Sequence, residues 1–429
     1  MTALALGLVC MFVLAAVGIP IAFAMAFAGF LGFGMIVGFS PAMAMVGQLT
    51  FDTALSYNLS ILPLFILMGN FITRARLSQD LYAAAHAFVG HFRGGIALST
   101  LIACAGFSAV SGSSLATAAT MSRVAMPEMR RFGYADSLAA GSIAAGGTLG
   151  ILIPPSVALV LYGIITGNDI GKLFMAGILP GLLGLVLYCA AVSVVTFRNP
   201  AAGPRGDRTG WGQRIRVLGR VWGVCLLFLV VIGGIYSGFF TTTEAAGIGA
   251  FVAAVFAVVR GKLTFVEMFE TLVESARMTA MIFSILIGAM IFANFVNVAG
   301  LLQVLDQALR NMNLTPMGVL FGVFFVYLVL GMVMESMSMM LLTIPIFYPL
   351  VIGYGFDPIW FGIFVVVVIE IGLITPPVGM NVFVLRSTLP DVKTSLIFHG
   401  VMPFVVADII RLGLIIALPA LALFLPGHL

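Results

Sequence analysis

The chain has 429 residues, of which 62% are hydrophobic and only 8% are charged, and its mean hydropathy is +1.19. Soluble proteins carry about 25% charged residues, so this composition excludes a soluble domain and predicts an all-α polytopic membrane protein. The net charge of +4 is too modest to indicate nucleic-acid binding. The four cysteines lie apart in apolar stretches, without the spacing of a metal site or a disulfide framework. We expect no organic cofactor.

The N-terminal part of the chain, residues 1–51, contains no charged residue. A spanning helix needs roughly 20 mostly apolar residues, so this stretch is long enough for two. It lacks a basic leader region and a small-residue cleavage site, which favours a first membrane helix over a signal peptide. Three later stretches mix polar and apolar residues and are predicted to be amphipathic helices along the interface, or ordinary loops: residues 43–58, 77–90 and 263–274.

Residues 94–122 form an uncharged run with basic residues on both sides. Arg93 precedes the run and Arg123 follows it, so the positive-inside rule puts both ends in the cytoplasm. The run is too short to cross the membrane twice, which predicts a re-entrant hairpin with its turn near Ser111–Ser114. The tip, residues 111–117, is rich in small and hydroxyl residues that suit a hard cation. Close helix packing through small residues is the alternative.

A helix break is predicted where Gly150 is followed by Pro154 and Pro155. Proline removes a backbone donor and clashes with the carbonyl four residues back, so the break frees carbonyls in the membrane. A bound Na⁺ or a water could pair with them. The half-helix after the break directs its N-terminal amides inward, where they could hold an anionic group. A purely structural kink is the alternative.

The hydrophilic segment 198–220 holds six arginines and one aspartate. It is predicted to be a cytoplasmic linker that separates two halves of the chain. A second hairpin is expected at about residues 315–350, where the flanks are poor in positive charge. The halves are therefore predicted to be inverted, with about ten spanning helices, two re-entrant hairpins and two broken helices.

The two halves share a repeated motif. The sequence at 150–156, Gly-Ile-Leu-Ile-Pro-Pro-Ser, recurs at 372–378 as Gly-Leu-Ile-Thr-Pro-Pro-Val. At the same offset along the chain, Ser114 corresponds to Ser336. Paired broken helices in matching halves indicate the binding site of a secondary transporter.

Two acids, Glu335 and Glu370, interrupt apolar segments of the second half. Such acids are functional candidates by default. They could balance the charge of a cation, carry a proton, or only orient the hairpin. Residues 241–244, Thr-Thr-Thr-Glu, fit a capping box at the start of a helix.

These patterns give two sets of candidate site residues. No arginine lies inside a hairpin or beside a Pro–Pro pair, so an anionic substrate would be held by helix N-termini, hydroxyls and amides. The predicted substrate-binding residues are Ser113, Ser114, Thr117, Pro155, Ser156, Ser336, Pro377 and Asn381. The predicted Na⁺ ligands are Ser111, Ser113, Gly147, Thr148, Gly150, Glu335, Ser338, Gly372 and Thr375.

The motifs resemble those of the large membrane subunit of tripartite ATP-independent periplasmic (TRAP) transporters, the dicarboxylate-type M subunit. The matching stretches are 61–70, 111–120, 147–156, 241–245 and 372–381. Two positions depart from the family pattern: Glu335 stands where Asp is frequent, and Thr242 stands where Pro is frequent. The first departure could alter the geometry near the site.

The resemblance implies a sodium-coupled importer of organic acids in the bacterial inner membrane. It also implies two partners, a small four-helix membrane subunit and a periplasmic substrate-binding protein, and an elevator motion. The implied domains are scaffold helices with an interfacial arm (1–93), transport half 1 (94–165), scaffold with the linker (166–314), transport half 2 (315–388) and a C-terminal scaffold helix (389–429).

Three other classes of protein are less consistent with the sequence. A stand-alone sodium-coupled carboxylate symporter would have similar hairpins but would not need a small subunit. A membrane enzyme would need a cluster of His or Asp, and the four histidines are scattered. A channel has no need for inverted broken repeats, which suit alternating access.

Overall fold

A computed structural model describes residues 2–75, 77–260 and 263–428, and every regular element in these ranges is a helix. The predicted all-α fold is thereby confirmed. The helices of the first half are α1 (Thr2–Ala16), α2 (Ile21–Val37), α3 (Phe39–Leu55), η1 (Tyr57–Ser60), α4 (Ile61–Arg74), α5 (Leu77–Val89), α6 (Gly95–Ser111), α7 (Ser114–Arg131), α8 (Asp136–Thr148), η2 (Leu149–Ile151), α9 (Val157–Thr166) and α10 (Ile170–Arg198).

The second half begins with the segment that connects it to α10. Its elements are η3 (Pro200–Ala202), α11 (Trp211–Leu218), α12 (Trp222–Tyr236), α13 (Thr242–Val259), α14 (Phe265–Val298), α15 (Leu301–Asn311), α16 (Pro316–Gly331), α17 (Ser336–Gly353), α18 (Pro358–Ile374), α19 (Met380–Thr388), α20 (Thr394–Ala417), α21 (Ala420–Leu423) and η4 (Pro426–His428).

Many of these helices have the length and composition of membrane spans. Five helices in the described ranges are long and apolar enough to cross a membrane, or up to seven if two bent pairs each count as one span. Six further apolar helices are 10–17 residues long, among them the helix after the first predicted break, α9, and the helix before the second, α18. The count of about ten membrane spans stays a prediction. A broken helix is long enough to cross the membrane only if its two pieces count as one span.

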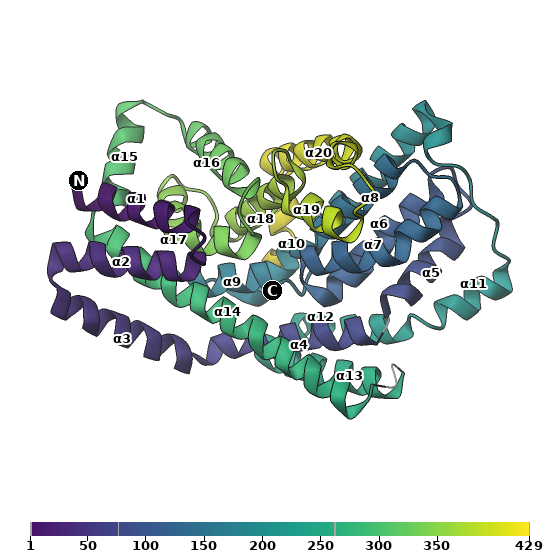
Figure 1. The fold of residues 1–429 in the computed structure, drawn as a ribbon, viewed down its shortest axis with the longest axis horizontal. Coiled ribbons are helices and arrows are strands. Elements are labelled where there is room, and N and C mark those ends of the chain that lie inside the picture. Colours follow the sequence, from purple (N-terminus) through teal and green to yellow (C-terminus); the bar gives the residue numbers. More distant parts are fainter. Residues whose placement is uncertain (1, 76, 261–262, 429) are drawn as a thin grey trace.

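The sequence repeat is a repeat of structure. Helices α7 and α17 begin at Ser114 and Ser336, and helices α8 and α18 begin at Asp136 and Pro358, so the two pairs have the same spacing along the chain. Each Pro–Pro pair, joined by a cis peptide bond, lies in the gap before a short helix, α9 or α19. Both halves therefore contain a helical hairpin followed by a helix that is interrupted near its end. Figure 1 shows α6, α7 and α8 to the right of the middle of the molecule and α16 and α17 to its left, with α18 between them.

The first predicted hairpin turns at the expected place but is longer than the uncharged run. Helix α6 ends at Ser111 and α7 begins at Ser114, with Gly112 in a left-handed conformation (φ 60°). Helix α7 continues to Arg131, beyond the predicted end at residue 122. The separate interfacial helix expected at 263–274 is wrong: from Phe265 this stretch is the first part of α14, a single helix of 34 residues. The capping box of Thr241 and Glu244 is confirmed.

The arginine-rich segment 198–220 is folded against the base of the first hairpin. Gly94 N–H donates to the Gly203 carbonyl (3.0 Å), and Ala135 N–H donates to the Ala202 carbonyl (3.1 Å). Tyr134 donates its hydroxyl to the Pro204 carbonyl at 2.9 Å, and burial raises the pKa of Tyr134 to about 12, which keeps that proton in place. The segment thus connects both ends of the hairpin rather than serving as a free linker.

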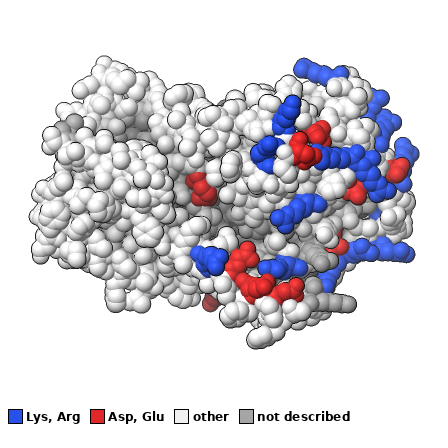
Figure 2. All heavy atoms as spheres, in the orientation of Figure 1, with Lys and Arg blue, Asp and Glu red and all other residues white. Residues whose placement is uncertain are grey.

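Charged residues gather at one end of the molecule. Figure 2 shows blue and red atoms over the half that carries α5, α7 and α11, while the opposite half of this face is almost free of charge. Ion pairs in this region include Arg130 with Asp136 and Asp391, and Arg260 with Asp80. Arg93 lies just before α6 and Arg130 lies near the end of α7, at the base of the first hairpin. Arg123, the basic flank expected after the uncharged run, lies inside α7 instead, so the expectation that no arginine lies within a hairpin is wrong.

Candidate functional site

In the first half, the hairpin tip meets the break in the α8–α9 helix. A methyl group added to Gly150 would lie 3.1 Å from the Ser113 carbonyl oxygen, and one added to Gly112 would lie 3.1 Å from the Pro155 carbonyl oxygen. A side chain at either position would therefore push these backbones apart by a few tenths of an ångström. Ser113 caps α7, accepting a hydrogen bond from Ala116 N–H.

Hydroxyl groups at this tip are hydrogen-bonded to one another. Ser111 and Thr117 lie 2.9 Å apart between their hydroxyl oxygens, and Thr117 donates to the Ser113 carbonyl at 2.8 Å. The tip therefore concentrates hydroxyl and carbonyl oxygens within one turn of the chain. Such oxygens are the ligands that a hard cation prefers.

In the second half, the hairpin tip and the break meet in the same way. Gly379 N–H, in the α18–α19 break, donates to the Met332 carbonyl at 3.1 Å, where α16 ends. Gly331 and Gly372 bring α16 and α18 together, since a methyl group on Gly372 would lie 2.7 Å from the Gly331 Cα. The sequence predicted both breaks, and the structure brings each one to its own hairpin.

Glu335 caps helix α17 and is the counterpart of Ser113 in the repeat. Its Oε2 accepts from Met337 N–H (2.9 Å) and Ser338 N–H (3.1 Å), and its Oε1 accepts from the Ser336 hydroxyl (2.7 Å). A carboxylate at a helix N-terminus is stabilised by the free amides and the helix dipole. These contacts favour the interpretation in which Glu335 orients the hairpin, and they place its negative charge beside Ser336 and Ser338.

The two halves are joined by Asn381, in the first turn of α19. Its Oδ1 accepts from the Ser114 hydroxyl at 2.8 Å, and its Nδ2 donates to the Ala144 carbonyl of α8 at 2.9 Å. Ser114 and Asn381 are both buried. Gly147 lies close by, because a methyl group there would be 3.2 Å from Asn381 Nδ2. Predicted residues from both halves therefore meet at one place in the protein interior.

Other predicted residues point away from this meeting point. The Ser156 hydroxyl caps α9 and bonds to the Ile151 carbonyl of its own loop. The Thr148 hydroxyl faces Tyr188 of α10 at 3.1 Å, and the Thr375 hydroxyl donates to the Ile371 carbonyl at 2.6 Å. The hydroxyls of these three residues are thus occupied within their own helices or by α10.

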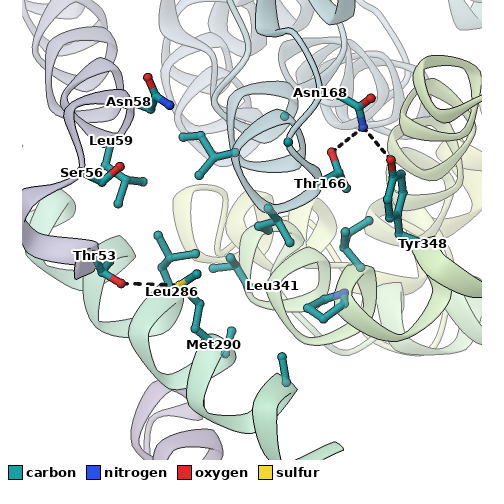
Figure 3. Close-up of a pocket in the computed structure, with 18 of the residues that line it drawn as sticks. Thr53, Ser56, Asn58, Leu59, Thr166, Asn168, Leu286, Met290, Leu341 and Tyr348 are labelled. Carbon is teal, nitrogen blue, oxygen red and sulfur yellow. Dashed lines mark hydrogen bonds between the residues drawn. The ribbon is translucent and has the colours of Figure 1, made fainter. Parts of the chain in front are cut away.

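A cavity of about 720 Å³ lies to one side of the second hairpin. It is enclosed by the ends of α3 and α9 and by parts of α14 and α17 (Figure 3). Asn168 on this wall donates to Thr166 (2.7 Å) and to the Tyr348 hydroxyl (3.1 Å). None of the sequence-predicted site residues lines this cavity. Its polar residues were missed because single amides at the ends of apolar runs look like ordinary helix ends.

The described residues contain no group of three or more His, Cys, Asp or Glu that could hold a metal ion. A monovalent cation bound by hydroxyl and carbonyl oxygens does not need such a group. The oxygen-rich tip of the first hairpin, and the pairing of tip with break in each half, are therefore the features that match the predicted chemistry.

Comparison with known proteins identifies the relatives of this chain. The family model described as the DctM component of tripartite ATP-independent periplasmic transporters matches residues 8–421. The chain is 38% identical to the C4-dicarboxylate TRAP transporter large permease protein DctM of Pseudomonas aeruginosa, over 88% of each chain. It is 31% identical to the sialic acid TRAP transporter large permease protein SiaM of Vibrio cholerae, over 95% of each chain.

Two further matches extend the comparison. The isethionate TRAP transporter permease protein DctMQ of Oleidesulfovibrio alaskensis is 32% identical over 96% of this chain and 64% of that protein. A solved structure of the Alcanivorax borkumensis YdaH transporter superposes with a TM-score of 0.59 at 14% identity, covering 90% of this chain and 87% of the other. That similarity concerns the fold alone.

Proposed function

The chain belongs to the DctM component family of TRAP transporters, and we propose that it is the large permease subunit of a sodium-coupled importer of an organic acid. The observation that supports this most directly is the meeting of hairpin tip and helix break in each of two matched halves. Discontinuous helices in corresponding positions surround the substrate and ion sites of secondary transporters. Relatives named for C4-dicarboxylates and sialic acid support a substrate that carries a carboxylate.

We assign Na⁺ to the two tip-and-break pairs. In the first, hydroxyl and backbone oxygens of Ser111, Ser113, Gly147, Thr148 and Gly150 would surround the ion. In the second, the ion would be surrounded by Glu335, Ser338, Gly372 and Thr375. The Glu335 carboxylate would supply the negative charge that balances the ion. The substrate would lie between them, at Ser113, Ser114, Thr117, Pro155, Ser336, Pro377 and Asn381, where the bond from Ser114 to Asn381 joins the halves. Ser156, whose hydroxyl is occupied in its own loop, would contribute only backbone groups.

The transport unit in this proposal consists of residues 94–165 and 315–388, and it moves as an elevator against a scaffold. The cavity beside α17 is consistent with that division, because α3 and α14 on one wall belong to the proposed scaffold and α9 and α17 on the other belong to the transport unit. A seam between a moving and a fixed unit is expected to be less tightly packed than either interior.

A small four-helix membrane subunit and a periplasmic substrate-binding protein are the proposed partners, in the bacterial inner membrane. Exposed apolar faces on the proposed scaffold, for example at Phe23, Phe251 and Phe269, would contact lipid or the small subunit. A stand-alone carboxylate symporter is the alternative. Purification would distinguish the two, because a TRAP permease would copurify with the small subunit and transport only in the presence of the binding protein.

We expect uptake to require Na⁺. The test is proteoliposome transport of the acid that the binding protein recognises, found first by thermal shift of that protein against a panel of organic acids. The sodium and proton gradients are then varied separately. Uptake should follow the sodium gradient, because a bound Na⁺ can pair with the carbonyl and hydroxyl oxygens at the two breaks. Full uptake driven by protons without Na⁺ would contradict the assignment of both ion sites.

We also expect Arg93 and Arg131, at the two ends of the first hairpin, to face the cytoplasm. In a variant without the four native cysteines, R93C and R131C should both resist an impermeant thiol reagent applied from outside. S237C, in the loop before α13, should react, because a single crossing by α12 from the cytoplasmic segment 198–220 would put that loop outside. Opposite labelling at positions 93 and 131 would mean that the α6–α7 hairpin crosses the membrane.

A further inference from the structure

Helix α11, in the arginine-rich segment, has two faces of different character. On one face, Val217 is buried against Ala84 of α5. On another face, Trp211, Ile215 and Leu218 are 72%, 68% and 52% exposed. Residues at this spacing form one stripe along a helix, because a turn takes 3.6 residues. The helix therefore packs on the protein through one face and leaves a large apolar stripe uncovered on another.

The exposed stripe continues onto α12, which follows α11 after a bend of 46°. Trp222, Leu226 and Leu229 are exposed on α12 at the same helical spacing. Helix α12 contains no charged residue and is long and apolar enough to form a membrane span together with α11. The apolar surface of a predicted span thus extends without interruption onto a helix of the arginine-rich segment.

The same segment carries positive charge that the protein does not neutralise. Arg208, Arg216 and Arg220 are exposed. Among the described residues, none of the six arginines in segment 198–220 forms an ion pair with a carboxylate. Acids at this end of the molecule pair with other arginines, for example Asp80 with Arg260. The stripe therefore lies among arginines that are free to bind an anion.

Arg214 is the one arginine of α11 that is engaged with the protein, and it orients the stripe. Its Nε donates to the Ala87 carbonyl at 3.0 Å. Its guanidinium carbon lies 5.0 Å from the centre of the Trp211 ring and 5.7 Å from that of Phe88. A cation over an aromatic face is attracted to it, so this contact holds Trp211 on the outside of the helix. Figure 1 shows α11 beside α5, at the right-hand end of the molecule where Figure 2 shows the charged side chains.

We propose that α11 binds anionic phospholipid of the cytoplasmic leaflet. The stripe would lie at the boundary between headgroups and acyl chains, and the exposed arginines would bind lipid phosphates. A helix with Trp and Leu on one face and basic residues on another lies in this plane, and basic clusters next to a spanning helix attract anionic lipid. The positive-inside rule puts the segment on the cytoplasmic side. The proposal goes beyond sodium coupling and does not depend on it.

The small membrane subunit would fit this surface less well. The core of a protein interface is depleted in charged residues, whereas arginines here lie before, within and after the stripe. A partner that buried them would need an acid for each one, because an unpaired buried charge is strongly unfavourable. A membrane surface supplies many phosphates without fixed spacing, and tryptophan is enriched at that interface.

The lipid contact would act on the base of the first hairpin. The residues just before α11 bond to that base, including Gly203 to Gly94, and Gly206 N–H donates to the Gly90 carbonyl at 3.1 Å. Arg214 adds its bond to Ala87 at the end of α5. Lipid bound along α11 would therefore attach the base of the first hairpin to the cytoplasmic leaflet.

The fluorescence of Trp211 tests the proposal, because the chain has only three tryptophans. The variant W222F/W360F leaves Trp211 as the single reporter. The transporter, purified with its small subunit, is placed in phosphatidylcholine nanodiscs that contain either phosphatidylglycerol or phosphatidylcholine brominated near the top of the acyl chain. Quenching should rise at least about five times as steeply with brominated phosphatidylglycerol, since one basic residue near an anionic surface contributes about a fivefold preference.

Two triple variants in the same background locate the effect. R208Q/R216Q/R220Q should lower the slope for phosphatidylglycerol to that for phosphatidylcholine. R123Q/R131Q/K393Q is the matched control, because it removes three exposed charges from other elements predicted to lie on the cytoplasmic side. It should leave the steep slope in place.

Four results would overturn the proposal. Equal slopes for the two lipids in the parent protein would mean that α11 does not select anionic lipid. Quenching by acrylamide but by neither lipid would place α11 in water. Resistance to all three quenchers would show that a protein, such as the small subunit, covers the stripe. An equal loss of slope in the two triple variants would mean that the preference comes from the overall charge and not from α11.

Discussion

Replacement of Asn381 by alanine is expected to lower transport at least about tenfold while leaving membrane insertion intact. The variant removes both hydrogen bonds that Asn381 makes with the first half and leaves the Ala144 carbonyl and the Ser114 hydroxyl without this partner. An unpaired buried polar group costs about 1–3 kcal/mol, and about 1.4 kcal/mol corresponds to a factor of ten. The measurement is the initial rate of uptake in proteoliposomes with the binding protein present.

Two further variants make this result specific. N381D retains the acceptor for Ser114 but loses the donor to Ala144, so it shows which bond matters more. S122A is the matched control, because Ser122 makes another side-chain contact between α7 and α19, to Thr388 at 3.2 Å. Transport by N381A at the wild-type rate would mean that the hydrogen bond between Ser114 and Asn381 is not needed for transport. A loss of transport in S122A equal to that in N381A would indicate that any weakened contact between α7 and α19 has this effect.

The features predicted well from the sequence depend on local chemistry. Gly112 and the serines around it fix the first turn, and a pair of adjacent prolines breaks a helix by removing two backbone donors. Single prolines do not have this effect here, since Pro127 and Pro180 lie inside helices α7 and α10. Both effects act within a few residues, so the positions of the hairpin turns and breaks follow from the sequence alone. The constant offset between the repeated motifs then relates the two halves, and helix boundaries repeat at that spacing.

The contacts between distant residues could not be predicted in this way. Asn381 was a candidate by type, but its partner Ser114 is 267 residues away, and its counterpart in the repeat is Leu159, which has no polar group. Arg411 of α20 forms buried ion pairs with Asp408 and Glu370. Asp408 and Arg411 were overlooked, although an acid and a base three residues apart inside an apolar run are a usable signal for a buried pair. Tyr188, which donates its hydroxyl to Asp408 at 2.6 Å, carries no such signal, because a single tyrosine in a long apolar helix is common.

The segment 198–220 shows a different limit. Its arginines and glycines are typical of a solvated connection, and its composition gave no indication that it binds the base of the first hairpin. The bonds to Gly94 and Ala135 use backbone groups, which every residue possesses. Composition therefore predicts which side of the membrane such a segment occupies but not what it contacts.

Replacement of Gly372 by alanine is expected to disrupt the second tip-and-break pair. The new Cβ would lie 2.7 Å from the Gly331 Cα and 2.9 Å from its carbonyl carbon. Both are backbone atoms, so helices α16 and α18 must separate. Overpacking of this kind costs about 1–3 kcal/mol. We expect a lower melting midpoint and a severe loss of sodium-dependent uptake, because separation of the helices moves the hairpin tip away from its break.

The repeat and the neighbouring helix provide graded controls for this effect. G150A, at the matched position of the first half, would place its methyl group 3.1 Å from the Ser113 carbonyl oxygen and should be less damaging. G322A, on α16, meets no atom within 4 Å and should be neutral or slightly stabilising, since alanine favours a helix over glycine by about 1 kcal/mol. Among the three variants, G322A is therefore expected to be the most stable, G150A to be intermediate and G372A to be the least stable. If G372A were as stable and as active as G322A, the close approach of α16 and α18 would not hold the second tip-and-break pair together, and the assignment of a sodium site there would lose its structural basis.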